Sequence, residues 1–83
     1  MSITPSSTWT HLQGQYLAFI YAYSKVHRCP PAEADMQRFF RVTPPSVHRM
    51  VVELESKGFI RRTPGKARRI EILVHPAQLP PLE

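Results

Sequence analysis

The chain has 83 residues, of which eleven are Lys or Arg and six are Asp or Glu, so its formal net charge is +5. A chain this short leaves room for one small domain, and the concentration of basic residues in its second half favours an anionic partner. The lone cysteine, Cys29, excludes an internal disulfide, and no apolar run approaches the roughly 18 residues of a membrane span, so we expect a soluble, cytoplasmic protein without membrane attachment.

The first half of the chain predicts two helices. Residues 1–7 have the Ser, Thr and Pro content of a loose arm, and Thr8 or Thr10 can cap a helix that continues to about His27. Pro30-Pro31 ends that helix, and a shorter one is expected from Ala32 or Glu33 to Phe40. The residues expected to face inward are Leu12, Tyr16, Leu17, Phe19, Ile20 and Tyr23 in the first helix, and Met36, Phe39 and Phe40 in the second.

Aromatic side chains are unusually frequent in and just before the first helix. They are more than one face of a small domain can bury, namely Trp9, Tyr16, Phe19, Tyr21 and Tyr23. Some of them can contact a second subunit, or all of them can cover the domain's own core. We expect a homodimer, formed through the first helix or the termini.

A third helix is predicted from Pro44 to about Lys57. Thr43 can cap it, two prolines fit its first turn, and Gly58 can end it in the left-handed conformation. Its apolar residues recur at helical spacing and comprise Val47, Met50, Val51 and Leu54. The opposite face carries Ser46, His48, Arg49 and Glu53.

A charged β-hairpin follows the third helix. Phe59 and Ile60 begin its first strand, Pro64-Gly65 suits a type II turn, and Ile70 and Ile72 share one face of its second strand. The stretch 61–69 contains no acidic residue and five basic ones, Arg61, Arg62, Lys66, Arg68 and Arg69. A hairpin so charged is suited to contacting phosphates.

The remaining segment, from His75 to Glu83, is rich in proline. We expect a domain over residues 8–74 and a tail over 75–83, in which Leu82-Glu83 looks like a linker before an expression tag. The fold class is therefore mostly α with a small antiparallel β-hairpin.

The stretch VHRMVVELESKGFIRRTPGKARRIEIL resembles the recognition helix and wing of the LexA repressor DNA-binding domain, most specifically in its GKAR-x-IE run. LAFIYAY followed by CPP extends the resemblance over about Leu17 to Leu73. It implies a winged helix-turn-helix that binds double-stranded DNA as a transcriptional regulator, here without the family's larger self-cleaving domain. Two departures concern the second helix: Ala32 stands where a capping Thr is usual, and Phe40 and Arg41 stand where the family has Gly.

In the family, the residues that touch bases lie at the positions of Thr43, Pro45, Ser46, His48 and Arg49. The resemblance thus implies base reading by Thr43, Ser46, His48 and Arg49, and phosphate contacts by the five basic hairpin residues. A well-known member has acidic residues at the positions of His48 and Arg49. Since a carboxylate accepts from cytosine and Arg donates to guanine, the preferred DNA sequence should differ.

Other functions are less well supported by the sequence. The four histidines and the cysteine lack metal-ligand spacing, and no nucleophile–base motif is present, so neither a metal, a cofactor nor enzymatic activity is expected. The alternative that stays open is a winged-helix module that binds another protein.

Overall fold

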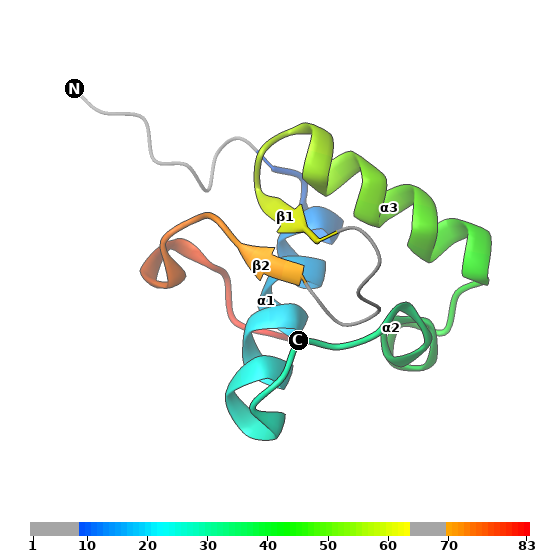
Figure 1. Ribbon diagram of the computed structural model, residues 1–83, viewed down its shortest axis with the longest axis horizontal. Coiled ribbons are helices and arrows are strands. Elements are labelled where there is room, and N and C mark those ends of the chain that lie inside the picture. Colours follow the sequence, from blue (N-terminus) through cyan, green and yellow to red (C-terminus); the bar gives the residue numbers. More distant parts are fainter. Residues whose placement is uncertain (1–8, 64–69) are drawn as a thin grey trace.

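The computed structural model describes residues 9–63 and 70–83 (Figure 1). Helices α1 (His11–His27), α2 (Glu33–Phe40) and α3 (Pro44–Ser56) are followed by strands β1 (Ile60–Arg62) and β2 (Ile70–Ile72) and by a 3-10 helix, η2 (Pro76–Gln78). The two strands pair antiparallel. This confirms the predicted winged helix-turn-helix of three helices and a small hairpin.

Helix α1 begins at His11, and its N-cap is Thr10, one of the two predicted caps, which forms a capping box. The Thr10 hydroxyl accepts a hydrogen bond from the Gln13 backbone N–H at 3.1 Å, and the Gln13 side-chain oxygen accepts one from the Thr10 N–H at 2.9 Å. Residues 13–20 are all buried. Leu12 was wrongly expected to face inward: it is 51% exposed, because it lies at the rim of a groove that it lines with Met50 and Arg49 of α3.

Helix α2 packs through Met36, which is fully buried, and Phe40, which stacks on Tyr16 with ring centroids 4.0 Å apart. Phe39 was also expected to face inward and is instead 44% exposed, with its ring stacked on that of Phe19 at a centroid distance of 4.5 Å. Met36 and Phe40 are four residues apart and share the inner face, so their neighbour is rotated about 100° away from it. Burial raises the pKa of the Tyr16 hydroxyl, because it disfavours the phenolate.

Helix α2 has neither a capping Thr at its start nor a Gly at its end. Arg41 takes the left-handed conformation (φ 57°, ψ 49°) that more often falls to glycine. At the start of α2, the Asp35 carboxylate accepts from the Ala32 N–H at 2.8 Å, which satisfies one backbone donor although Ala32 has no capping side chain. Both ends of α2 therefore form with other residues in those positions, Asp35 at the start and Arg41 at the end.

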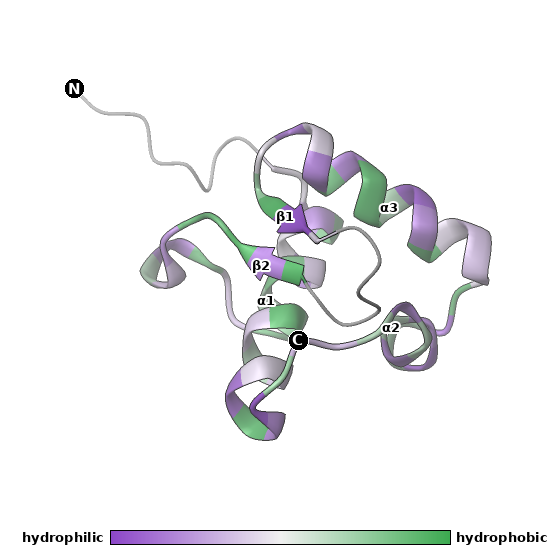
Figure 2. Ribbon diagram, in the orientation of Figure 1, coloured by the Kyte–Doolittle hydropathy of each residue, from purple (hydrophilic) through white to green (hydrophobic). Residues whose placement is uncertain are grey.

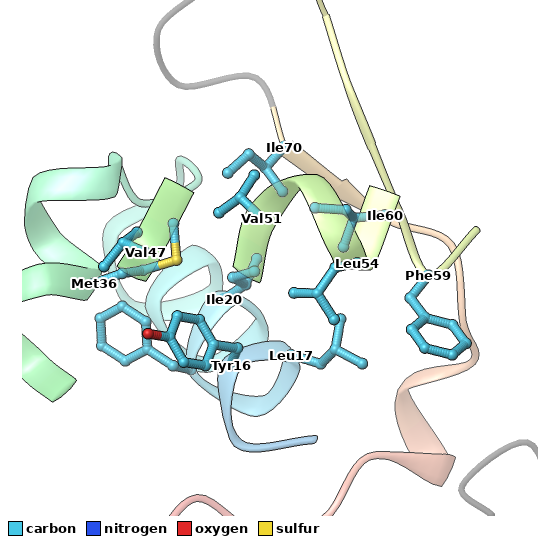
Figure 3. Packing of buried hydrophobic residues seen from close by; sticks show 11 residues of the cluster. Tyr16, Leu17, Ile20, Met36, Val47, Val51, Leu54, Phe59, Ile60 and Ile70 are labelled. Carbon is cyan, nitrogen blue, oxygen red and sulfur yellow. The ribbon is translucent and has the colours of Figure 1, made fainter. Parts of the chain in front are cut away.

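Helix α3 starts at the predicted cap and ends one residue earlier than predicted. Thr43 accepts from the Ser46 N–H, and Gly58 follows the helix with φ 81°. The predicted apolar stripe is confirmed, since Val47, Val51 and Leu54 are fully buried, with Met50 partly buried beside them. Figure 3 shows the side chains of Val47, Val51 and Leu54 among those of α1, α2 and the hairpin.

The hairpin places its isoleucines against the core. Ile60 pairs with Ile72, and Arg62 pairs with Ile70. Ile70 is buried and Ile72 partly buried, whereas Glu71 is exposed, which confirms the predicted faces of the second strand. The predicted Pro64-Gly65 turn lies outside the described residues.

The C-terminal segment returns to α1 (Figure 1). The Gln15 side chain donates to the Pro81 carbonyl and accepts from the Glu83 N–H, each at 2.9 Å. Gly14 makes room for this packing, because a Cβ there would lie 3.0 Å from Nε1 of Trp9 and 3.1 Å from Cγ of Pro80. We expected the proline-rich segment 75–83 to be a tail outside the domain. It instead packs on α1.

Candidate nucleic-acid interface

The solvent-facing side of α3 is mostly polar, with Val52 as an exposed apolar residue, and Figure 2 shows hydrophilic positions alternating with hydrophobic ones along this helix. Ser46, His48 and Arg49 are exposed in its first turns, and Thr43 is exposed at its cap. The structure therefore brings the four predicted base-reading residues together at one end of α3. The cause is the helical period, which buries Val47 and Val51 and turns His48 and Arg49 outward.

Two of these side chains, Thr43 and Ser46, also form hydrogen bonds at the start of α3. The Thr43 hydroxyl lies 3.0 Å from the Ser46 hydroxyl and 3.4 Å from the Ser46 backbone nitrogen. Each hydroxyl has one proton and two lone pairs, so this local pairing leaves further capacity for an external partner. Thr43 and Ser46 form a small pre-arranged hydroxyl pair beside the cap.

His48 is held toward α2 by a carboxylate. Its Nδ1 lies 3.4 Å from Oε2 of Glu33, and both side chains are substantially exposed. The same carboxylate oxygen is 3.8 Å from the Arg62 guanidinium. Glu33 was not among the predicted site residues, and the sequence gives no signal for it, because its two partners lie 15 and 29 positions away.

Arg62 is also bound to α3. Its Nε donates to Glu55 at 3.0 Å, and its backbone N–H donates to the other oxygen of the same carboxylate at 3.3 Å. One third of the Arg62 side chain is exposed. Arg62 belongs to the basic stretch of the hairpin, and it also links β1 to α2 and α3 through these two carboxylates.

Arg61 pairs with Glu71 across the hairpin at 2.5 Å, and both side chains are more than 60% exposed. A pair this exposed is worth about 0–1 kcal/mol. The stretch 61–69 lacks acidic residues, yet its first two arginines find carboxylates on β2, α2 and α3. Lys66, Arg68 and Arg69, the other predicted phosphate contacts, lie outside the described residues.

The described residues supply little for other chemistry. No group of three potential metal ligands occurs among residues 9–63 and 70–83. In the same ranges, no helix is long and apolar enough to cross a membrane. What the surface does offer is a protruding helix with hydroxyl, imidazole and guanidinium groups, a shape and chemistry that suit a major groove.

A comparison with known families agrees with this geometry. The chain matches the family model of the LexA DNA binding domain over residues 6–69, well over half of its length. The matched span contains α1, α2, α3 and β1 and every predicted contact residue. It begins earlier than the sequence resemblance, which started at about Leu17.

Proposed function

We propose that this chain, which belongs to the LexA DNA-binding domain family, is a sequence-specific regulator that inserts α3 into the major groove and lays its wing along the phosphate backbone. The family supports DNA binding and transcription regulation. The finer assignment is ours: base reading by Thr43, Ser46, His48 and Arg49, and phosphate contact by Arg61, Arg62, Lys66, Arg68 and Arg69.

The observation that carries the proposal is the exposed polar end of α3. Base edges in the major groove present donors and acceptors that such side chains can match. Arg49 is exposed one turn into the helix, where its guanidinium can donate to O6 and N7 of guanine. The cap hydroxyls of Thr43 and Ser46 can contact either a base or the adjacent phosphate.

The wing arginines differ in how available they are. Arg61 is about two-thirds exposed and has one exposed partner, Glu71. Arg62 is shared between two carboxylates, Glu55 and Glu33, so a phosphate must compete with them. We therefore expect Arg61 to contribute more to DNA affinity than Arg62.

The test separates base reading from phosphate contact. Arg49→Ala should weaken the binding free energy by about 1 to 3 kcal/mol on a preferred site selected from random duplex, and by much less on scrambled DNA. Lys66→Ala or Arg68→Ala should weaken both duplexes alike and reduce the salt slope by about 1 each. Lys25→Ala, which removes a charge from α1, is the matched control and should change neither. If Arg49→Ala weakens both duplexes equally while a wing variant alters base preference, the two roles are reversed.

A salt titration of DNA binding also tests the alternative, that this chain is a protein-binding module. Binding to random duplex should fall steeply as salt rises, because bound phosphates release counterions. An absence of binding at low salt would leave a protein partner as the better explanation of the exposed surface.

We further propose that the regulator acts as a homodimer, since one module of this size buries little DNA surface. We expected a homodimer because the first helix has more aromatic side chains than one face can bury. Fewer of them are exposed than expected: Tyr16 and Phe19 are buried, while Trp9, Tyr21 and Tyr23 are partly buried. Val26 and Phe39, at 75% and 44% exposure, add apolar surface on the helices. Sedimentation at tens of micromolar concentration should show a dimer, and a monomer there would refute this part of the proposal.

A further inference from the structure

Four side chains from three elements form a continuous polar chain beside the proposed reading surface. Glu33 of α2 contacts His48 of α3 at 3.4 Å and Arg62 of β1 at 3.8 Å, through the same oxygen. Arg62 in turn binds Glu55 of α3 at 3.0 Å. In Figure 1, α2 lies beside the beginning of α3, which places Glu33 and His48 on adjoining elements.

The contact constrains where His48 carries its proton. An ionised carboxylate can only accept hydrogen bonds, so the imidazole nitrogen that faces Glu33, Nδ1, must be the donor. In a neutral histidine the other nitrogen, Nε2, then bears a lone pair. The tautomer of a histidine is commonly set in this way, by the hydrogen bond that its other nitrogen makes.

We infer that Glu33 is a specificity-determining residue that acts through His48: it fixes the Nδ1–H tautomer, so that Nε2 accepts from an exocyclic amine of cytosine or adenine. Guanine offers N7 and O6, which are acceptors, and is disfavoured opposite such a nitrogen. The base-selecting half of this inference rests on the proposed function. The tautomer itself is a property of the free protein.

Arg62 supports the arrangement. Its guanidinium Nε and its backbone N–H each donate a hydrogen bond to Glu55, and the guanidinium places a positive charge beside the Glu33 oxygen that faces His48. Glu55 contacts Arg62, whereas Glu33 contacts both Arg62 and His48. Glu55→Gln is therefore a matched control. It removes a carboxylate charge from the same set of four linked side chains and leaves the Glu33–His48 contact in place.

The first experiment needs no DNA. Nitrogen NMR distinguishes the two imidazole nitrogens, and the His48 signals are identified by their loss in His48→Gln. At a pH where the side chain is neutral, the wild type and Glu55→Gln should show the Nδ1–H form as the major tautomer. Glu33→Ala should lose that preference. A wild-type His48 that is mainly Nε2–H, or a tautomer unchanged in Glu33→Ala, would overturn the positioning role.

The second experiment tests base selection. Wild-type protein and Glu33→Ala each select sequences from a random duplex pool, and affinities are compared at the base pairs where the two pools differ. The wild type should prefer C or A over G at one position by about tenfold, and Glu33→Ala should reduce that ratio severalfold while keeping the guanine preference that depends on Arg49. Identical pools would overturn the inference. A wild type that selects nothing would refute the proposed function, and the NMR result would still decide the tautomer.

Discussion

Replacing Arg41 with glycine should stabilise the protein. Arg41 ends α2 with φ 57°, and its side chain is exposed. An L-residue in this conformation costs roughly 1–2 kcal/mol, because its Cβ crowds a carbonyl oxygen. Glycine removes that cost but makes the unfolded chain more flexible, which offsets about 0.4–1 kcal/mol. With mid-range values of both terms, the net expected gain in unfolding free energy is about 0.5–1 kcal/mol.

Thermal unfolding measures this gain. For a domain of this size, 1 kcal/mol corresponds to about 4–8 °C in Tm, so Arg41→Gly should raise Tm by about 2–8 °C. The backbone N–H that donates to the Gln37 carbonyl is retained in the variant. Arg41→Lys keeps the Cβ and the charge and should leave Tm unchanged. Arg28→Gly, at the equivalent left-handed position after α1 (φ 62°), should give a similar gain. A lower Tm in Arg41→Gly alone would mean that the Arg41 side chain stabilises the turn more than its conformation strains it.

Three further changes test the packing and the wing. Leu54→Ala, at a fully buried position, should lower the unfolding free energy by about 2–5 kcal/mol in urea titration, and a loss below about 1 kcal/mol would contradict the core assignment. Gln15→Ala should cost about 1–3 kcal/mol by the same measurement, since it breaks both hydrogen bonds to the C-terminal segment; no loss would mean that this segment does not stabilise the domain. Gly65→Val should weaken DNA binding with helicity by circular dichroism unchanged, because a type II turn needs positive φ at that position; unaltered binding would mean that the turn or the wing's role is misassigned.

Much of this fold is encoded locally and was therefore accessible from sequence. The cap at Thr43, the spacing of Val47, Val51 and Leu54, and Gly58 are all interactions within a few residues, and the third helix was predicted to within one residue. The errors concern positions at element edges. Leu12 fits a helical stripe, but which end of a stripe is covered depends on how long the neighbouring element is. Phe39 lies on the flank of the stripe, about 100° from its partly buried neighbour Phe40.

In the candidate site, too, local features could be predicted from the sequence and contacts between distant residues could not. A helical period predicts that Ser46, His48 and Arg49 share an exposed face, and alternation predicts that Glu71 faces away from the core. No local rule predicts that Glu33 and Glu55 converge on Arg62, because that contact exists only once α2, α3 and β1 are packed. Counting charges along the hairpin therefore does not reveal that Arg61 and Arg62 have carboxylate partners.

The burial of residues 13–20 has a consequence for the dynamics of the molecule. Eight consecutive buried positions mean that α1 is covered around its whole circumference over two turns, by the core on one side and by the C-terminal segment on the other. Backbone amides exchange with solvent through openings of the surrounding structure, and buried central elements open only with the whole domain. Amide hydrogens in this stretch should therefore exchange at the rate set by global unfolding, while those near the polar end of α3 exchange through smaller, local openings.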